Sequence, residues 1–112
     1  MGKTVSKGVN ILLKSSLAFK IQKRDNFICK YCGKDGLESA LAWHQTAVDH
    51  FNPRLKDPER NAEENLITAC EYCNSLKGGR KFNTIKDAKV YLEKRKKEKH
   101  EEFLKVKKTI RG

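Results

Sequence analysis

Two pairs of cysteines with the same internal spacing frame the middle of this chain. Cys29 and Cys32 form one C-x2-C pair, and Cys70 and Cys73 form the other, with 37 residues between the pairs. A C-x2-C turn delivers two sulfurs to one metal ion with little strain, and tetrahedral zinc accepts four thiolates readily. The spacing therefore predicts one structural zinc site made by all four cysteines, rather than a redox pair or ordinary buried thiols.

A second group of polar residues lies between and beside the cysteines: Asp49, His50, Asn65 and Asn74. Carboxylate and amide oxygens are ligands for hard cations such as Mg²⁺ or Mn²⁺, and a neutral imidazole can take a proton from water. Four thiolates leave zinc no open position, so this catalytic ion must be a separate one. Taken singly, each residue also fits a turn or a surface amide, but their combination within the cysteine frame favours catalysis.

The order of these residues resembles that of the HNH endonuclease family. The resemblance covers about residues 24–81, and its core motifs are Val48-Asp49-His50, Asn65-Leu66 and Cys73-Asn74. It implies a ββα-metal (His-Me finger) core, in which one strand ends in Asp-His, a loop leads to an Asn-Leu strand, and a helix follows. Two details depart from the family pattern. Asn74 stands where a His is frequent, and the loop after His50 lacks the frequent pair of glycines.

The resemblance also implies a role for each residue. Asp49 and Asn74 would hold one Mg²⁺ or Mn²⁺ ion, and His50 would be the general base that activates water. Asn65 would orient the imidazole by accepting a bond from one ring nitrogen, through either its side chain or its backbone. The implied activity is endonucleolytic hydrolysis of DNA, by nicking or double-strand cleavage, to a 5′-phosphate and a 3′-hydroxyl.

Charge supports a polyanionic partner. The 25 Lys and Arg outnumber the 14 Asp and Glu, which gives a formal net charge of +11. The middle of the chain, residues 35–76, is acidic with a net of −5, whereas both flanks are basic. Basic flanks would hold a phosphate backbone against a cation in the acidic middle. Candidate phosphate contacts, with solvated surface as the alternative, are Lys77, Arg80 and Arg54. The alternative function is a noncatalytic zinc-dependent nucleic-acid-binding module.

These residues need an α+β scaffold, and 112 residues suit a single domain. The pattern predicts a flexible basic arm (1–9), an amphipathic helix (10–24), strands over 41–50 and 65–69, a short helix (71–77) and a long basic helix (84–108). Trp43 is expected on the first strand, packed near the zinc. Apolar side chains near the C-terminus are a candidate contact for a homodimer: Phe103, Leu104, Val106 and Ile110. No segment resembles a membrane span, so a reducing cytoplasmic setting is expected.

Overall fold

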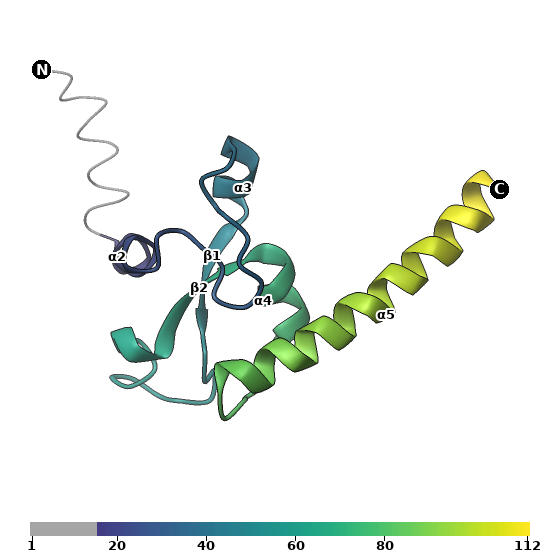
Figure 1. The fold of residues 1–112 in the computed structure, drawn as a ribbon. Coiled ribbons are helices and arrows are strands. Elements are labelled where there is room, and N and C mark those ends of the chain that lie inside the picture. The colour runs from purple at the N-terminus through teal and green to yellow at the C-terminus, as the bar shows by residue number, and fades with distance from the viewer. Residues whose placement is uncertain (1–15) are drawn as a thin grey trace, which may run out of the picture.

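The computed structural model describes residues 16–112 and forms a small α+β fold (Figure 1). The predicted basic arm and the first part of the predicted helix over 10–24 lie outside the described residues. The elements in chain order are α2 (Leu17–Arg24), α3 (Ala40–His44), β1 (Thr46–His50), the 3-10 turn η2 (Glu63–Asn65), β2 (Leu66–Cys70), α4 (Glu71–Lys77) and α5 (Ile85–Arg111). No helix within the described residues is long and apolar enough to cross a membrane.

The two strands and the helix that follows them form the predicted ββα unit. β1 and β2 pair antiparallel, with His50 opposite Leu66 and Thr46 opposite Cys70. All five residues of β2 are buried. Cys70 caps α4 by accepting a hydrogen bond from the backbone of Cys73, and Gly78, with a positive φ of 57°, ends the helix. The α+β class and its ββα core are therefore confirmed.

The predicted strand over 41–50 is wrong in its first half. Residues Ala40–His44 form the short helix α3, and the strand begins only at Thr46. Ser39 caps this helix by accepting a bond from the backbone of Ala42, and the alanines around Leu41 favour a helix. Trp43 is consequently 48% exposed, so it does not pack in the core around the cysteines as expected.

The outer edge of β2 is closed by side chains from the end of α2. The carboxylate of Asp25 accepts a 3.0 Å hydrogen bond from the backbone N–H of Thr68. The guanidinium of Arg24 donates to the backbone oxygens of Glu63 and Leu66, at 2.8 and 2.7 Å, and also pairs with Asp25. An exposed strand edge has unpaired backbone groups that need partners. Arg24 and Asp25 supply those partners and fasten α2 to the sheet.

We expect Asp25→Ala to lower the free energy of unfolding by about 1–3 kcal/mol, because the buried Thr68 N–H loses its charged acceptor. Burial alone would raise the pKa of Asp25, but hydrogen bonds from Arg24 and Thr68 lower it below its ordinary value. Asp25 thus stabilises the fold above its unfolded pKa of about 3.9, and this contribution is lost as pH falls through the lower folded value. Urea unfolding at neutral pH, with Glu38→Ala as the control, measures the effect; equal losses in both variants would contradict it.

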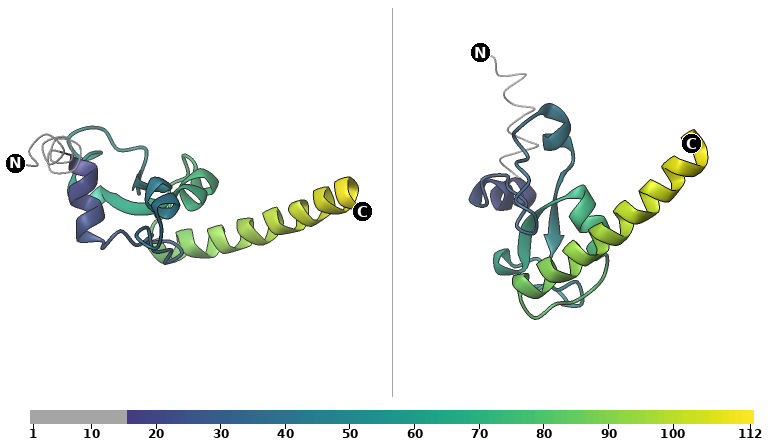
Figure 2. Two further views of the ribbon diagram at one scale, coloured as in Figure 1. Left: turned by 90° about the horizontal axis from the view of Figure 1, so that it is seen from above. Right: turned by 45° about the vertical axis from the view of Figure 1, so that its right-hand side comes forward.

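Helix α5 contributes one end to the core and extends away from it. Thr84 caps the helix, and Ala88 and Leu92 join the core beside three of the cysteines. The second half of α5 projects from the rest of the described chain in both views of Figure 2. The apolar side chains predicted as a dimer contact lie on this half and are 48–73% exposed: Phe103, Leu104, Val106 and Ile110. The homodimer itself stays a prediction.

Candidate metal centres and active site

The four cysteines meet in one cluster. Their sulfur atoms all lie within 4.8 Å of one another, and the sulfurs of Cys32 and Cys70 are 3.7 Å apart. A tetrahedral zinc ion with bonds of about 2.3 Å requires sulfurs about 3.8 Å apart. Three of the cysteines are buried and only Cys32 is exposed. The cluster is therefore close enough for the predicted structural zinc site.

A lysine from α5 lies beside this cluster. Burial lowers the pKa of Lys96, but hydrogen bonding to the sulfur of Cys73 and the charge of the nearby thiols raise it above its ordinary value. The Lys96 ammonium also lies 5.4 Å from the centre of the Tyr72 ring. Zinc with four thiolates would carry a net charge of −2, and the ammonium of Lys96 would offset part of that charge. Lys96 thereby links α5 to the cysteine cluster.

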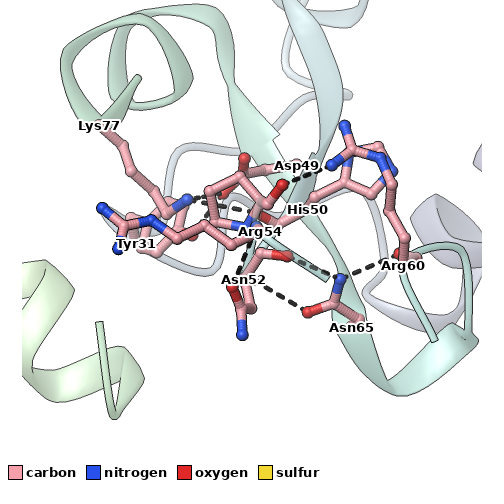
Figure 3. Close-up of polar contacts among 9 residues, drawn as sticks. Tyr31, Asp49, His50, Asn52, Arg54, Arg60, Asn65 and Lys77 are labelled. Carbon is pink, nitrogen blue, oxygen red and sulfur yellow. Dashed lines mark hydrogen bonds and ion pairs between the residues drawn. The ribbon is translucent and has the colours of Figure 1, made fainter. Parts of the chain in front are cut away.

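Asp49 is held by two buried partners at the end of β1 (Figure 3). The hydroxyl of Tyr31 donates a 2.5 Å hydrogen bond to Oδ2 of Asp49, and the ammonium of Lys77 lies 3.2 Å from the same oxygen. Burial, and then the bond to Asp49, raise the pKa of Tyr31 well above its ordinary value, so this hydroxyl remains a donor. Both contacts reach Oδ2, and within residues 16–112 no hydrogen bond to Oδ1 is made, so Oδ1 could accept another ligand.

Lys77 does not have the position that its predicted role requires. Its side chain is fully buried, whereas a phosphate contact must be accessible. The ammonium instead bridges the Asp49 carboxylate and the next residue of β1, because it also donates a 3.2 Å hydrogen bond to the backbone oxygen of His50. The other two candidate phosphate contacts, Arg54 and Arg80, are exposed. Their predicted role is compatible with their positions and stays a prediction.

Asn74 lies on helix α4, which packs against β1, the strand that ends with Asp49 and His50. A shared ion between Asp49 and Asn74 stays a prediction. Residues three apart on a helix share a face, so Asn74 lies on the same face as Lys77, which contacts Asp49. Asn74 is half-buried. A carboxylate oxygen and an amide oxygen are donors that suit a hard divalent cation, which retains several waters or phosphate oxygens when the protein supplies few ligands. The donor set therefore matches the predicted Mg²⁺ or Mn²⁺ site in its chemistry.

The imidazole of His50 has a partner that the sequence did not predict. Its Nε2 lies 2.8 Å from the side-chain oxygen of Asn61, and the amide nitrogen of Asn61 donates a 2.8 Å bond to Asp57. Both residues belong to the loop between β1 and η2. Successive side chains of a strand point to opposite faces, so Asp49 points toward Tyr31 and Lys77, while the ring of His50 points toward this loop.

Asn65 was expected to bond the His50 ring, and the structure gives it other partners. Its side-chain oxygen accepts a 2.9 Å bond from the backbone of Asn52, and its nitrogen donates to the backbone oxygens of Asn52 and Arg60. Its own backbone oxygen accepts from Phe51. Figure 3 shows this buried amide between the two ends of the loop. Asn65 thus fixes the loop that carries Asn61, and not the ring directly.

Three residues of this site were not predicted from the sequence: Tyr31, Asn61 and Asp57. Tyr31 stands inside the first cysteine pair, where its neighbours suggest only a metal-binding turn. Asn61 and Asp57 have the composition of an ordinary loop. A usable signal was the density of polar and charged residues in a loop that directly follows a candidate catalytic His.

Comparison with known proteins gives matches to endonucleases. The sequence model of the HNH endonucleases matches residues 29–80. A curated relative is the CRISPR-associated endonuclease Cas9 of Corynebacterium diphtheriae, which is 35% identical over 60 residues; the aligned part is 54% of this chain and 5% of that protein. No solved structure matches the chain significantly.

Two antiparallel strands followed by a helix, with Asp-His at the end of the first strand, define the ββα-metal class of folds. Within that class, the family match confirms the predicted resemblance to the HNH endonucleases over residues 29–80. The match begins at the first zinc-ligand candidate, Cys29, and ends at Arg80. It contains Asp49, His50, Asn65 and Asn74.

Proposed function

We propose that this protein is a metal-dependent endonuclease that hydrolyses phosphodiester bonds of DNA. The observation that carries the proposal is the arrangement of Asp49. Its carboxylate is buried and fixed through Oδ2 by Tyr31 and Lys77, so Oδ1 is the oxygen that would bind the ion. Lys77 lies on the face of α4 that also carries Asn74. A purely structural Asp–Lys pair would not need His50 as its neighbour or the HNH sequence frame around both.

Asp49 and Asn74 would hold the divalent cation, which, when bound, stabilises the negative charge that develops on the phosphate. His50 accepts a proton from the attacking water through the ring nitrogen that is not occupied by Asn61. Lys77 supports this arrangement from inside the fold, because its ammonium bonds both the carboxylate of Asp49 and the backbone of His50. Tyr31 adds a neutral donor to the same carboxylate.

Charge favours DNA as the substrate. The net charge of +11 favours binding to a polyanion, and the long helix α5 carries basic side chains over most of its exposed length. Arg54, four residues after His50 in sequence, and Arg80, three residues after Lys77, are exposed and would contact phosphates. These contacts would be largely independent of base sequence. Structural zinc at the cysteines and a reducing cytoplasmic setting are part of the same proposal.

We expect the zinc-loaded protein to convert supercoiled plasmid to open-circular or linear DNA with Mg²⁺ or Mn²⁺, and not after a chelator has removed these ions. The chelation must be brief and weak enough to leave zinc in place, which a zinc assay on the recovered protein verifies. Binding to DNA without scission under every metal condition, with affinity falling steeply as salt rises, would overturn the proposal and favour the noncatalytic binding module.

A further inference from the structure

In the loop between β1 and η2, the side chain of Asn61 contacts the predicted general base, His50. The side chain of Asp57 in turn orients Asn61. Nε2 of His50 lies 2.8 Å from Oδ1 of Asn61. The amide nitrogen of Asn61 donates a 2.8 Å hydrogen bond to Oδ1 of Asp57. A carboxylate only accepts hydrogen bonds, so Asp57 requires the NH₂ group of Asn61 on its own side. The amide oxygen must then face His50.

An amide oxygen also only accepts hydrogen bonds. In the neutral imidazole one ring nitrogen carries the proton and the other is an acceptor, and the group bonded to one nitrogen decides which. Opposite Oδ1 of Asn61, the proton must be on Nε2. The acceptor lone pair is then on Nδ1, and Nδ1 is the atom that would take a proton from water.

The position of Asn61 is itself determined by the buried Asn65. The side chain of Asn65 bonds the backbone of Asn52 at one end of the loop and that of Arg60, the neighbour of Asn61, at the other. Arg60 also donates from its guanidinium to the backbone oxygen of Pro53. These bonds close the loop on itself, so an exposed side chain such as Asn61 keeps one place relative to His50.

We propose that Asn61, oriented by Asp57, is a positioning residue that holds His50 in the Nε2–H tautomer and leaves Nδ1 as the proton acceptor. This inference rests on the proposed function for its consequence in catalysis. The tautomer itself does not depend on that function, because the hydrogen bonds are made without DNA or a divalent ion.

The test is the ¹⁵N spectrum of the imidazole rings in zinc-loaded protein, recorded without DNA at a pH where the rings are neutral. The His50→Ala spectrum assigns the His50 signals among the three histidines. We expect a protonated Nε2 and an unprotonated Nδ1 in the wild type. In Asn61→Ala the two nitrogen shifts move toward each other, and the Nε2–H proton exchanges faster with water. Glu59→Ala, an exposed acidic residue of the same loop, is the matched control and leaves the ring unchanged.

Exchanging the two side chains at positions 57 and 61 distinguishes a positioning role of Asn61 from a general loss of loop structure. In the double variant Asp57→Asn/Asn61→Asp, the new carboxylate at position 61 still accepts a hydrogen bond from the His50 ring. It also accepts one from the new amide at position 57, so we expect the wild-type tautomer to return. In plasmid cleavage, Asn61→Ala lowers kcat by about 10- to 100-fold, as losses of outer histidine partners do, with KM unchanged, and the double variant recovers most of that loss.

A His50 ring with the proton on Nδ1, or a ring unchanged in Asn61→Ala, would overturn this inference whether or not the wild type cleaves DNA. The reverse result, a ring that responds as expected in a protein that never nicks DNA with any divalent ion, would refute the proposed function and leave the tautomer assignment intact.

Discussion

Removing zinc from the cysteine cluster will unfold the described core. Cys29, Cys70 and Cys73 are among the buried residues at the centre of that core, and they join the first cysteine turn to the β2–α4 junction. A domain of this size buries a modest apolar surface. Structural zinc typically contributes about 10–16 kcal/mol of apparent binding free energy to such folds, which exceeds the usual stability of a small domain. We expect a chelator to abolish the cooperative thermal transition seen by circular dichroism.

Cys70→Ser should have the same effect, together with loss of the single zinc ion that we expect per chain in the wild type. Lys30→Ser is the control, since Lys30 is exposed within the first cysteine turn and supplies only its backbone N–H, to Thr68. A zinc-free protein that melts at the wild-type temperature would show that the cluster is not a folding element.

Replacing Asp49 by Ala is expected to lower the free energy of unfolding by about 3–5 kcal/mol, because the buried ammonium of Lys77 then lacks its counterion. Lys77 is 0% exposed and Asp49 is 7% exposed, so little water can replace the lost carboxylate. The exposed pair Lys20–Glu63 is shorter, at 2.9 Å against 3.2 Å. Glu63→Ala should nevertheless cost less than about 1 kcal/mol. The expected difference in stability loss between the two variants therefore comes from the burial of each ion pair and not from its N–O distance.

The double variant Asp49→Ala/Lys77→Met should regain most of this stability, because replacing a buried pair with apolar groups is often neutral. Urea unfolding of the four proteins in the cycle, all zinc-loaded, gives the coupling energy. If Asp49→Ala lowered the free energy of unfolding by less than about 1 kcal/mol, the buried ion pair would not have the predicted effect on stability. The double variant also serves cleavage assays, since it separates loss of a metal ligand from loss of the fold.

The sequence was sufficient for the features that depend on local spacing. The C-x2-C pairs and the short helix over 71–77, which is observed as α4 with the same bounds, are each determined by a few adjacent residues. The long helix predicted over 84–108 is observed as α5, and Thr84 caps it by accepting the first-turn bond from the backbone N–H of Asp87. β1 was overextended, since the apolar residues that suggest a strand before Thr46 belong to a helix capped by Ser39.

The features that the sequence could not supply depend on contacts between distant segments. A lysine at the end of a short helix is normally on the surface. Lys77 is buried because Asp49 and the His50 carbonyl, 28 and 27 residues away in sequence, face it. The choice between Asn61 and Asn65 as the partner of His50 depends on the path of the loop from Phe51 to Ala62. That path is set by the bonds of Asn65 to both of its ends, which no periodicity reveals.

The most direct test of the central claim compares plasmid nicking by the wild type and His50→Ala at the same protein and Mg²⁺ concentrations. Loss of a general base typically lowers the rate by about 10²- to 10⁴-fold. We expect that loss with zinc content and DNA binding unchanged, because the backbone oxygen that accepts from Lys77 remains. His44→Ala, an exposed histidine on α3, should cleave normally. Equal nicking rates for the wild type and His50→Ala would contradict the assignment of His50 as the base of a metal-dependent nuclease.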